Sequence, residues 1–135
     1  MKAEISRVEV KSAILESLRE QARLAHPEEC CGLLLGATDG AVDAFVPAAN
    51  RAANPLRHFE IDPAVLLHAH REARSGGPQV LGYYHSHPQG LAVPSVTDRE
   101  HSTGDLRIWA IIAGDVVAFW RDRGNGFDEV ACRVV

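Results

Sequence analysis

Lysine is almost absent from this 135-residue sequence: only Lys2 and Lys11 occur, no basic block is present, and the formal net charge is −4. Because phosphate neutralisation dominates nucleic-acid binding, this pattern argues against nucleic acid as the main partner. The sequence also lacks an apolar run of the roughly 20 residues that a membrane-spanning helix needs. The first ten residues lack the apolar core of a secretory signal, so we expect no membrane partner.

Cysteine is scarce as well, with only Cys30, Cys31 and Cys132. Adjacent cysteines rarely pair with each other, and an odd number provides no disulfide framework. We therefore expect buried free thiols and a reducing, cytoplasmic location. The adjacent pair also lacks the C-x2-C spacing of thiolate zinc sites, so we interpret it as core packing.

The remaining composition is that of an ordinary globular protein, with 46% hydrophobic and 24% charged residues. A length of 135 residues favours one domain, covering 1–135. A chain of this size buries roughly two thirds of the surface that it exposes when unfolded, so a core can form without disulfides.

Local patterns predict more strands than helices. Two principal helices are expected, over 13–25 after a Ser12 cap and from Pro63 after an Asp62 cap, together with a short helix that begins after Ser95. Strands are expected over 5–10, 31–35, 41–47, 57–61, 79–85, 106–112, 116–121 and 129–135. These elements predict an α+β fold, a mixed and mainly antiparallel β-sheet flanked by two principal helices.

The most informative pattern is H-x-H-x7-S-x2-D, formed by His85, His87, Ser95 and Asp98. Two imidazoles and a carboxylate suit a zinc ion and leave a fourth position open, as in catalytic zinc sites. Residues two apart on a strand point to the same face, so His85 and His87 can reach one ion. If Ser95 begins a helix, Asp98 lies one turn later on the same side as Ser95.

Each part of this pattern also has an ordinary structural interpretation, as strand-end histidines, a helix cap and a first-turn carboxylate. Only the whole string is specific. The second H-x-H, His68-Ala69-His70, lies in a predicted helix, where residues two apart point about 200° away from each other. We therefore interpret His68 and His70 as structural residues, and the remaining histidines likewise: His26, His58 and His101.

A zinc-dependent hydrolase also needs a group that moves a proton. Glu28 and Glu29 both precede the apolar segment 31–35, and burial beside such a strand raises the pKa of a carboxylate. Solvent-exposed loop carboxylates would give the same pattern. The residues alone therefore decide neither whether Glu28 or Glu29 is buried nor whether either of them moves a proton.

Taken together, His85-Ser86-His87-Pro88 and Pro94-Ser95-Val96-Thr97-Asp98 resemble the JAMM motif of the MPN-domain metallopeptidases. Segment 27–36 resembles the glutamate-containing strand of that family, and segment 50–63 resembles the linking region of its short bacterial members. The resemblance extends from about Val8 to Trp120 and implies an MPN/JAMM-like, cytidine-deaminase-like architecture. It implies that His85, His87 and Asp98 bind zinc. It further implies that Glu29 is the general acid/base and that Ser95 hydrogen-bonds the oxyanion.

The resemblance also implies a function, the zinc-dependent hydrolysis of a peptide or isopeptide bond. The expected substrate and partner is the C-terminal tail of a small ubiquitin-like or sulfur-carrier protein. Two alternatives stay open at this point: a non-catalytic zinc- or protein-binding MPN module, and a zinc amidase that acts on a small molecule.

Overall fold

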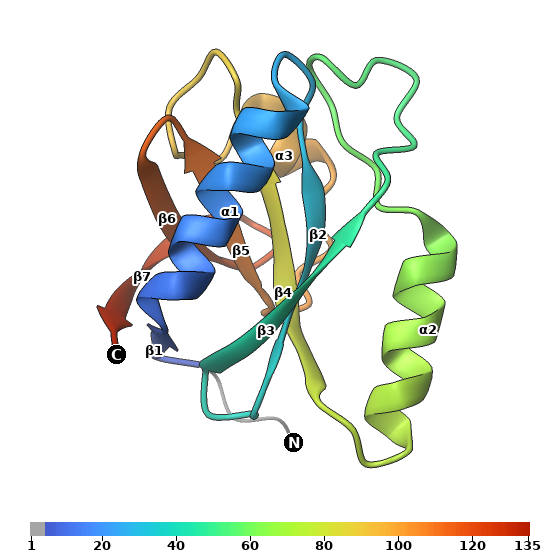
Figure 1. The fold of residues 1–135 in the computed structure, drawn as a ribbon, viewed down its shortest axis with the longest axis vertical. Helices are drawn as coiled ribbons and strands as arrows, with labels where there is room; N and C mark the ends of the chain where they lie inside the picture. The colour runs from blue at the N-terminus through green and yellow to red at the C-terminus, as the bar shows by residue number, and fades with distance from the viewer. Residues whose placement is uncertain (1–4) are drawn as a thin grey trace.

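A seven-stranded barrel forms the centre of the protein (Figure 1). The structure is a computed structural model that describes residues 5–135. Its strands are β1 (Arg7–Val10), β2 (Cys31–Gly36), β3 (Ala41–Ala48), β4 (Gln79–Ser86), β5 (Ile108–Ala113), β6 (Val116–Asp122) and β7 (Phe127–Val134). Within residues 5–135 the helices are α1 (Ser12–Ala25), α2 (Pro63–Arg74) and the short α3 (Val96–Glu100).

The strands follow one another around the barrel in the order β1-β3-β2-β4-β5-β6-β7. Hairpins β2–β3, β5–β6 and β6–β7 are antiparallel, as is the β2–β4 pair, whereas β4–β5 and β1–β3 are parallel. Parallel pairing of β1 with β7, from Arg7 opposite Ala131 to Val10 opposite Val134, closes the barrel.

This closure corrects the predicted fold class. A mixed, mainly antiparallel sheet flanked by two principal helices was wrong, because the sheet closes on itself into a barrel. The closing contact joins residues more than 120 positions apart in the sequence. The alternation of apolar residues within a strand predicts which face is buried, but it does not identify a partner at the other end of the chain.

Two hydrophobic clusters hold the helices against the barrel. Leu15 and Leu18 of α1 belong to a large cluster that includes Tyr84 of β4 and Phe119 of β6. A smaller cluster brings Ala69 of α2 together with strand residues Leu33 and Val80. Figure 1 shows α1 across the barrel and α2 to one side of it. β4 contributes to both clusters and therefore has buried side chains on both faces.

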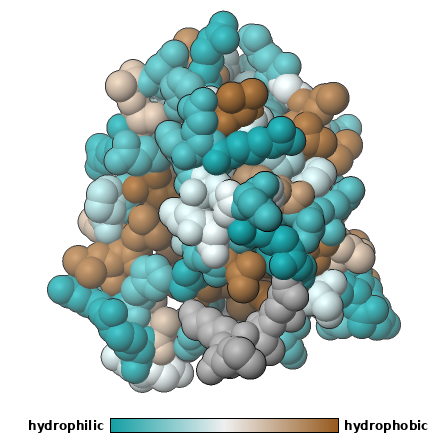
Figure 2. Space-filling model, turned by 180° about the vertical axis from the view of Figure 1, so that it is seen from behind, coloured by the Kyte–Doolittle hydropathy of each residue, from teal (hydrophilic) through white to brown (hydrophobic). Residues whose placement is uncertain are grey.

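The face of the protein opposite the view of Figure 1 is mostly polar. Figure 2, the view from behind, shows hydrophobic residues in small clusters among hydrophilic ones. In the part of the chain that the structure describes, no helix has both the length and the apolar character required to cross a membrane.

Several local predictions are confirmed and others are wrong. Asp62 caps α2 as predicted, because its side chain accepts a hydrogen bond from the Ala64 amide. Ser12 does not cap α1 and instead lies inside its first turn. The expected strand over 57–61 is reduced to a single bridge between Asn50 and Ile61. Cys30 and Cys31 are free and buried, but Cys132 is exposed, contrary to the expectation for it.

Candidate metal centre and proton-transfer site

Three side chains from two distant segments converge beside the end of β4. Nε2 of His85 and Nε2 of His87 are 3.0 Å apart, and each lies 3.1 Å from Oδ2 of Asp98. Among residues 5–135, these three side chains form the group of histidine, cysteine and acidic residues whose ligand atoms lie close enough together to hold a metal ion. The three residues that the sequence pattern selected are thus in one place.

β4 and its neighbours determine the direction of both imidazoles. His85 pairs with Cys31 of β2 on one side and with Ile111 of β5 on the other, and its side chain is 0% exposed. The His87 amide donates to the Ile112 carbonyl at 2.8 Å, so the extended backbone continues one residue beyond β4. Because side chains alternate along an extended strand, His85 and His87 project to the same side.

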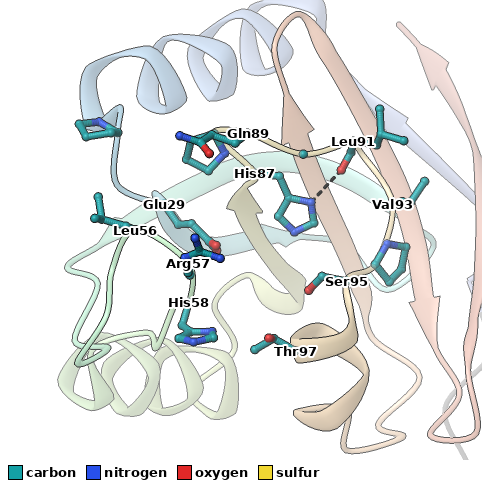
Figure 3. Close-up of a pocket in the computed structure, with 14 residues that line it drawn as sticks. Glu29, Leu56, Arg57, His58, His87, Gln89, Leu91, Val93, Ser95 and Thr97 are labelled. Carbon is teal, nitrogen blue, oxygen red and sulfur yellow. Dashed lines mark hydrogen bonds between the residues drawn. The ribbon is translucent and has the colours of Figure 1, made fainter.

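A backbone carbonyl fixes the tautomer of His87. Nδ1 of this ring lies 2.7 Å from the Leu91 carbonyl oxygen (Figure 3), which can only accept a hydrogen bond. In the neutral ring the proton is therefore on Nδ1, and Nε2 carries a lone pair that can bind a metal ion; only the protonated ring also donates from Nε2 to Asp98. Metal-binding histidines characteristically have their second nitrogen fixed in this way.

Asp98 joins the cluster through the start of α3. Ser95 and Asp98 form a capping box, in which Ser95 Oγ accepts from the Asp98 amide and Asp98 Oδ2 accepts from the Ser95 amide. The predicted cap is therefore confirmed. It also explains the S-x2-D spacing, because the reciprocal hydrogen bonds hold the carboxylate still while the same oxygen faces both imidazoles.

The electrostatics of the cluster favour an ionised carboxylate between histidines of unequal basicity. Burial alone would raise the pKa of Asp98, but hydrogen bonds from both imidazoles and from the Ser95 amide hold that pKa well below its usual range. Burial lowers the pKa of His85, which is fully enclosed. Burial also opposes ionisation of His87, yet its hydrogen bonds to Asp98 and Leu91 raise its pKa overall.

The donor set fits a zinc ion. Two imidazole nitrogens and one carboxylate oxygen are common zinc ligands, and ligand atoms of a tetrahedral zinc site are about 3.3 Å apart. The 3.0–3.1 Å triangle formed by His85, His87 and Asp98 is close to that spacing. The His85 ring differs from the usual zinc-binding histidine, because its Nδ1 is buried without a hydrogen-bond partner among the described residues. The ring instead stacks on Phe59, with ring centroids 4.2 Å apart.

The structure separates the two glutamates that the residues alone left equivalent. Glu28 is exposed, whereas Glu29 is only 6% exposed and lines the same cavity as His87 and Ser95. Burial raises the pKa of Glu29 from 4.5 to about 7, with smaller opposing contributions from His87 and Asp98. A carboxyl group with this pKa can both accept and return a proton near neutral pH.

The cavity has a volume of about 590 Å³ and two walls from different loops. Leu56, Arg57 and His58 form one wall, and segment 88–95 forms the other (Figure 3). The second wall is anchored to the barrel, because Nε1 of Trp120 donates to the Ala92 carbonyl at 3.0 Å. Glu29, His87 and Ser95 point into the space between these walls, where a substrate would be enclosed from two sides.

The remaining histidines lie outside the metal cluster, as their spacing indicated, although His58 lines the cavity beside it. His68 lies on α2, 4.0 Å from Glu72, and His101 caps the C-terminus of α3. Three contributors were missed from the sequence: the Leu91 carbonyl, the Phe59 ring and the Asn50 side chain, which donates to the Glu29 carbonyl. A backbone carbonyl leaves no signal in the sequence. Phe59 and Asn50 lie in a segment that the sequence connected with the site only through the family resemblance.

Comparison with known proteins places this geometry in a family. The family model for prokaryotic homologues of the JAB domain matches residues 11–123. The chain belongs to this family. The match includes Glu29 and the whole H-x-H-x7-S-x2-D pattern, so the predicted JAMM/MPN relationship is confirmed.

Individual relatives of this JAB-domain protein support the assignment. This chain is 36% identical over 108 residues to a desampylase from Haloferax volcanii, and the match covers 79% of this chain and 78% of that protein. It is 35% identical over 89 residues to a probable TtuB-protein conjugate cleaving protease from Thermus thermophilus, covering 66% of this chain and 59% of that protein. A solution structure from Desulfitobacterium hafniense superposes with a TM-score of 0.83 at 29% identity, over 95% of this chain and 92% of that one.

Proposed function

We propose that this JAB-domain protein is a zinc metallopeptidase that hydrolyses the bond attaching the C-terminal tail of a small ubiquitin-like or sulfur-carrier protein. The observation that carries the proposal is the convergence of His85, His87 and Asp98, within 3.1 Å of one another, beside the buried Glu29. A structural zinc site uses four protein ligands, whereas three ligands next to an open cavity leave room for water and substrate.

His85, His87 and Asp98 would hold the zinc ion, which when bound supplies Lewis acidity and lowers the pKa of water toward 7. Asp98 supplies the negative charge, and its capping hydrogen bonds with Ser95 prevent it from rotating away. His87 presents its unprotonated Nε2, because Nδ1 is committed to the Leu91 carbonyl. The three residues thus bring one charge and two neutral nitrogens to the ion.

Glu29 moves the proton. Its carboxylate removes a proton from the attacking water as the new C–O bond forms at the scissile carbonyl. When the C–N bond breaks, the protonated Glu29 returns that proton to the leaving amine, so the products are a carboxylic acid and an amine. Its raised pKa of about 7 suits both halves of this cycle, because neither transfer is then strongly uphill at neutral pH.

Ser95 stabilises the oxyanion. Ser95 Oγ accepts a hydrogen bond from the Asp98 amide, which leaves its own hydroxyl proton available to donate. The residue lines the cavity shared by Glu29 and His87. A donor at this position strengthens its hydrogen bond as negative charge develops on the carbonyl oxygen, which lowers the barrier to the reaction.

The substrate class rests on the named relatives. One is a desampylase and the other a probable TtuB-protein conjugate cleaving protease. The cavity is open on one side and bordered by the exposed Leu56 and Leu91, which suits a flexible tail better than a folded surface. We therefore assign a protein tail, rather than a small free amide, as the substrate.

The test is cleavage of a ubiquitin-like protein that ends in Gly-Gly and is fused to a reporter through its C-terminus. The parent protein loaded with zinc releases the reporter, and the metal-free parent does not. A small amide with no protein tail serves as the competing substrate. Equal or faster turnover of that amide would replace the proposed function with amidase activity, and bound zinc without cleavage of any tail would indicate a binding module.

A further inference from the structure

The general base and the metal cluster come from different parts of the chain. Glu29 precedes β2, whereas His85 belongs to β4 and Asp98 to α3. A mechanism that passes a proton through Glu29 needs these groups held in a fixed relationship, because a displacement of about 1 Å can cost a hundredfold in rate. The segment 50–61 touches both groups and contains little regular structure.

Asn50 is the centre of this segment. Its Nδ2 donates to two carbonyl oxygens, those of Glu29 at 3.1 Å and His58 at 2.9 Å. Its Oδ1 accepts from two amides, those of Ala52 at 3.0 Å and Glu60 at 3.1 Å. The arrangement fixes the orientation of the amide group, because a flipped side chain would set its donors against the two N–H groups and its acceptor against the two carbonyls.

The two carbonyls that Asn50 joins lead to the two halves of the site. One belongs to Glu29 itself. The other belongs to His58, whose peptide bond continues into Phe59, and the Phe59 ring stacks on His85 with an interplanar angle of 18°. The Glu29 amide also donates to the Pro55 carbonyl at 2.8 Å, so both backbone polar groups of Glu29 are bound to segment 50–61.

We propose that Asn50 is a positioning residue, whose side-chain amide fastens the backbone of Glu29 to the loop that packs Phe59 against His85. Asn50 contacts neither the metal cluster nor the open cavity, so it acts only through Glu29 and that loop. Its importance for turnover rests on the proposed function. Its structural role, which is to hydrogen-bond the backbone of Glu29 and that of His58, does not.

Asn50→Asp is the sharpest variant. It keeps the size of the side chain and the oxygen that accepts from Ala52 and Glu60, but it removes both donors and places a negative charge against two carbonyl oxygens. Asn54→Asp is the matched control, because it makes the same chemical change in the same loop and the Asn54 side chain forms no hydrogen bond with residues 5–135 in the structure. Asn50→Ala, which adds no charge, is the second variant in case Asn50→Asp fails to fold.

Two measurements test the proposal. The first is kcat and KM for the tail fusion in the parent and Glu29→Gln backgrounds, with zinc content recorded for every sample. We expect either Asn50 variant to lower kcat by roughly 10- to 100-fold, with KM and zinc nearly unchanged, as for other groups that orient active-site residues. In the Glu29→Gln background the same variant should have little further effect, because residues that act as a unit are not additive.

The second measurement is amide hydrogen exchange, which does not depend on activity. Protection of the Glu29 amide should fall about tenfold or more in Asn50→Asp, while the amides of β4 stay as protected as in the parent. Unchanged protection at Glu29, lost zinc, or an equal loss of kcat in both backgrounds would overturn the proposal. If the parent cleaves no tail but the Glu29 amide still loses protection, the proposed function fails and the role of Asn50 stands.

Discussion

Replacing Glu29 with Gln is expected to slow turnover sharply and, in the metal-free protein, to increase stability. The carboxyl group is 6% exposed, and its pKa is raised from 4.5 to about 7 by burial. Ionising it in the folded protein is therefore harder than in the unfolded chain, by up to about 3 kcal/mol. This value is an upper bound, because the side chain opens onto the cavity. Gln has nearly the same shape and carries no charge.

The sign of the stability effect depends on pH. Below pH 4.5 the carboxyl group is protonated in both states, and the variant gains nothing from the loss of charge. Between pH 4.5 and about 7 the folded parent retains a proton that the unfolded chain releases, so the parent loses stability as the pH rises. Above pH 7 the difference is constant. Urea unfolding of metal-free parent and Glu29→Gln at pH 4 and pH 8 measures this contrast.

The same variant tests catalysis. Loss of the general acid/base is expected to reduce kcat for the tail fusion by roughly 10²- to 10⁴-fold, while zinc binding continues because no proposed ligand changes. Glu28→Gln, which alters the exposed neighbour, is the control and should keep parental activity. A Glu29→Gln protein with near-parental turnover, or one that is less stable than the parent at pH 8, would refute the reasoning about this residue.

Three further outcomes are expected. Gly82→Ala should lower stability by about 1–3 kcal/mol or more, because an added Cβ would lie 1.7 Å from the Ile108 carbonyl oxygen; a thermal midpoint equal to that of the parent would contradict this. Ser95→Ala should reduce kcat by about 10²- to 10³-fold and stability by about 1 kcal/mol through the lost cap, whereas parental kcat would remove Ser95 from the mechanism. Because the ionised form of Glu29 accepts the proton, kcat/KM should fall as the pH drops through about 7, and a flat profile there would argue for another base.

The convergence of the metal cluster was predictable because its determinants are local. His85 and His87 are two residues apart on a strand, and Ser95 and Asp98 are one helical turn apart in a capping box. Each spacing fixes a relative direction without reference to the rest of the chain. The family relationship followed from the same residues, and the match over residues 11–123 confirms it.

Features that depend on distant contacts were not predictable in this way. Barrel closure depends on pairing between β1 and β7, at opposite ends of the chain, and the choice of Glu29 over Glu28 depends on burial by loops that fold back from elsewhere. Segment 57–61 has the composition of a strand, but the structure gives it only the Asn50–Ile61 bridge. Its backbone hydrogen bonds go instead to the Asn50 side chain and to the neighbouring loop.

The central claim is that His85, His87 and Asp98 hold a catalytic zinc ion. The most direct measurement is the zinc content of the purified parent, His87→Ala and His68→Ala proteins after dialysis, by elemental mass spectrometry. His68→Ala is the control because it removes a histidine from the other H-x-H pattern, which lies on α2. We expect about one zinc per chain in the parent and in His68→Ala, and none in His87→Ala. A parent that binds no zinc even after addition, or a His87→Ala protein that retains it, would contradict the claim.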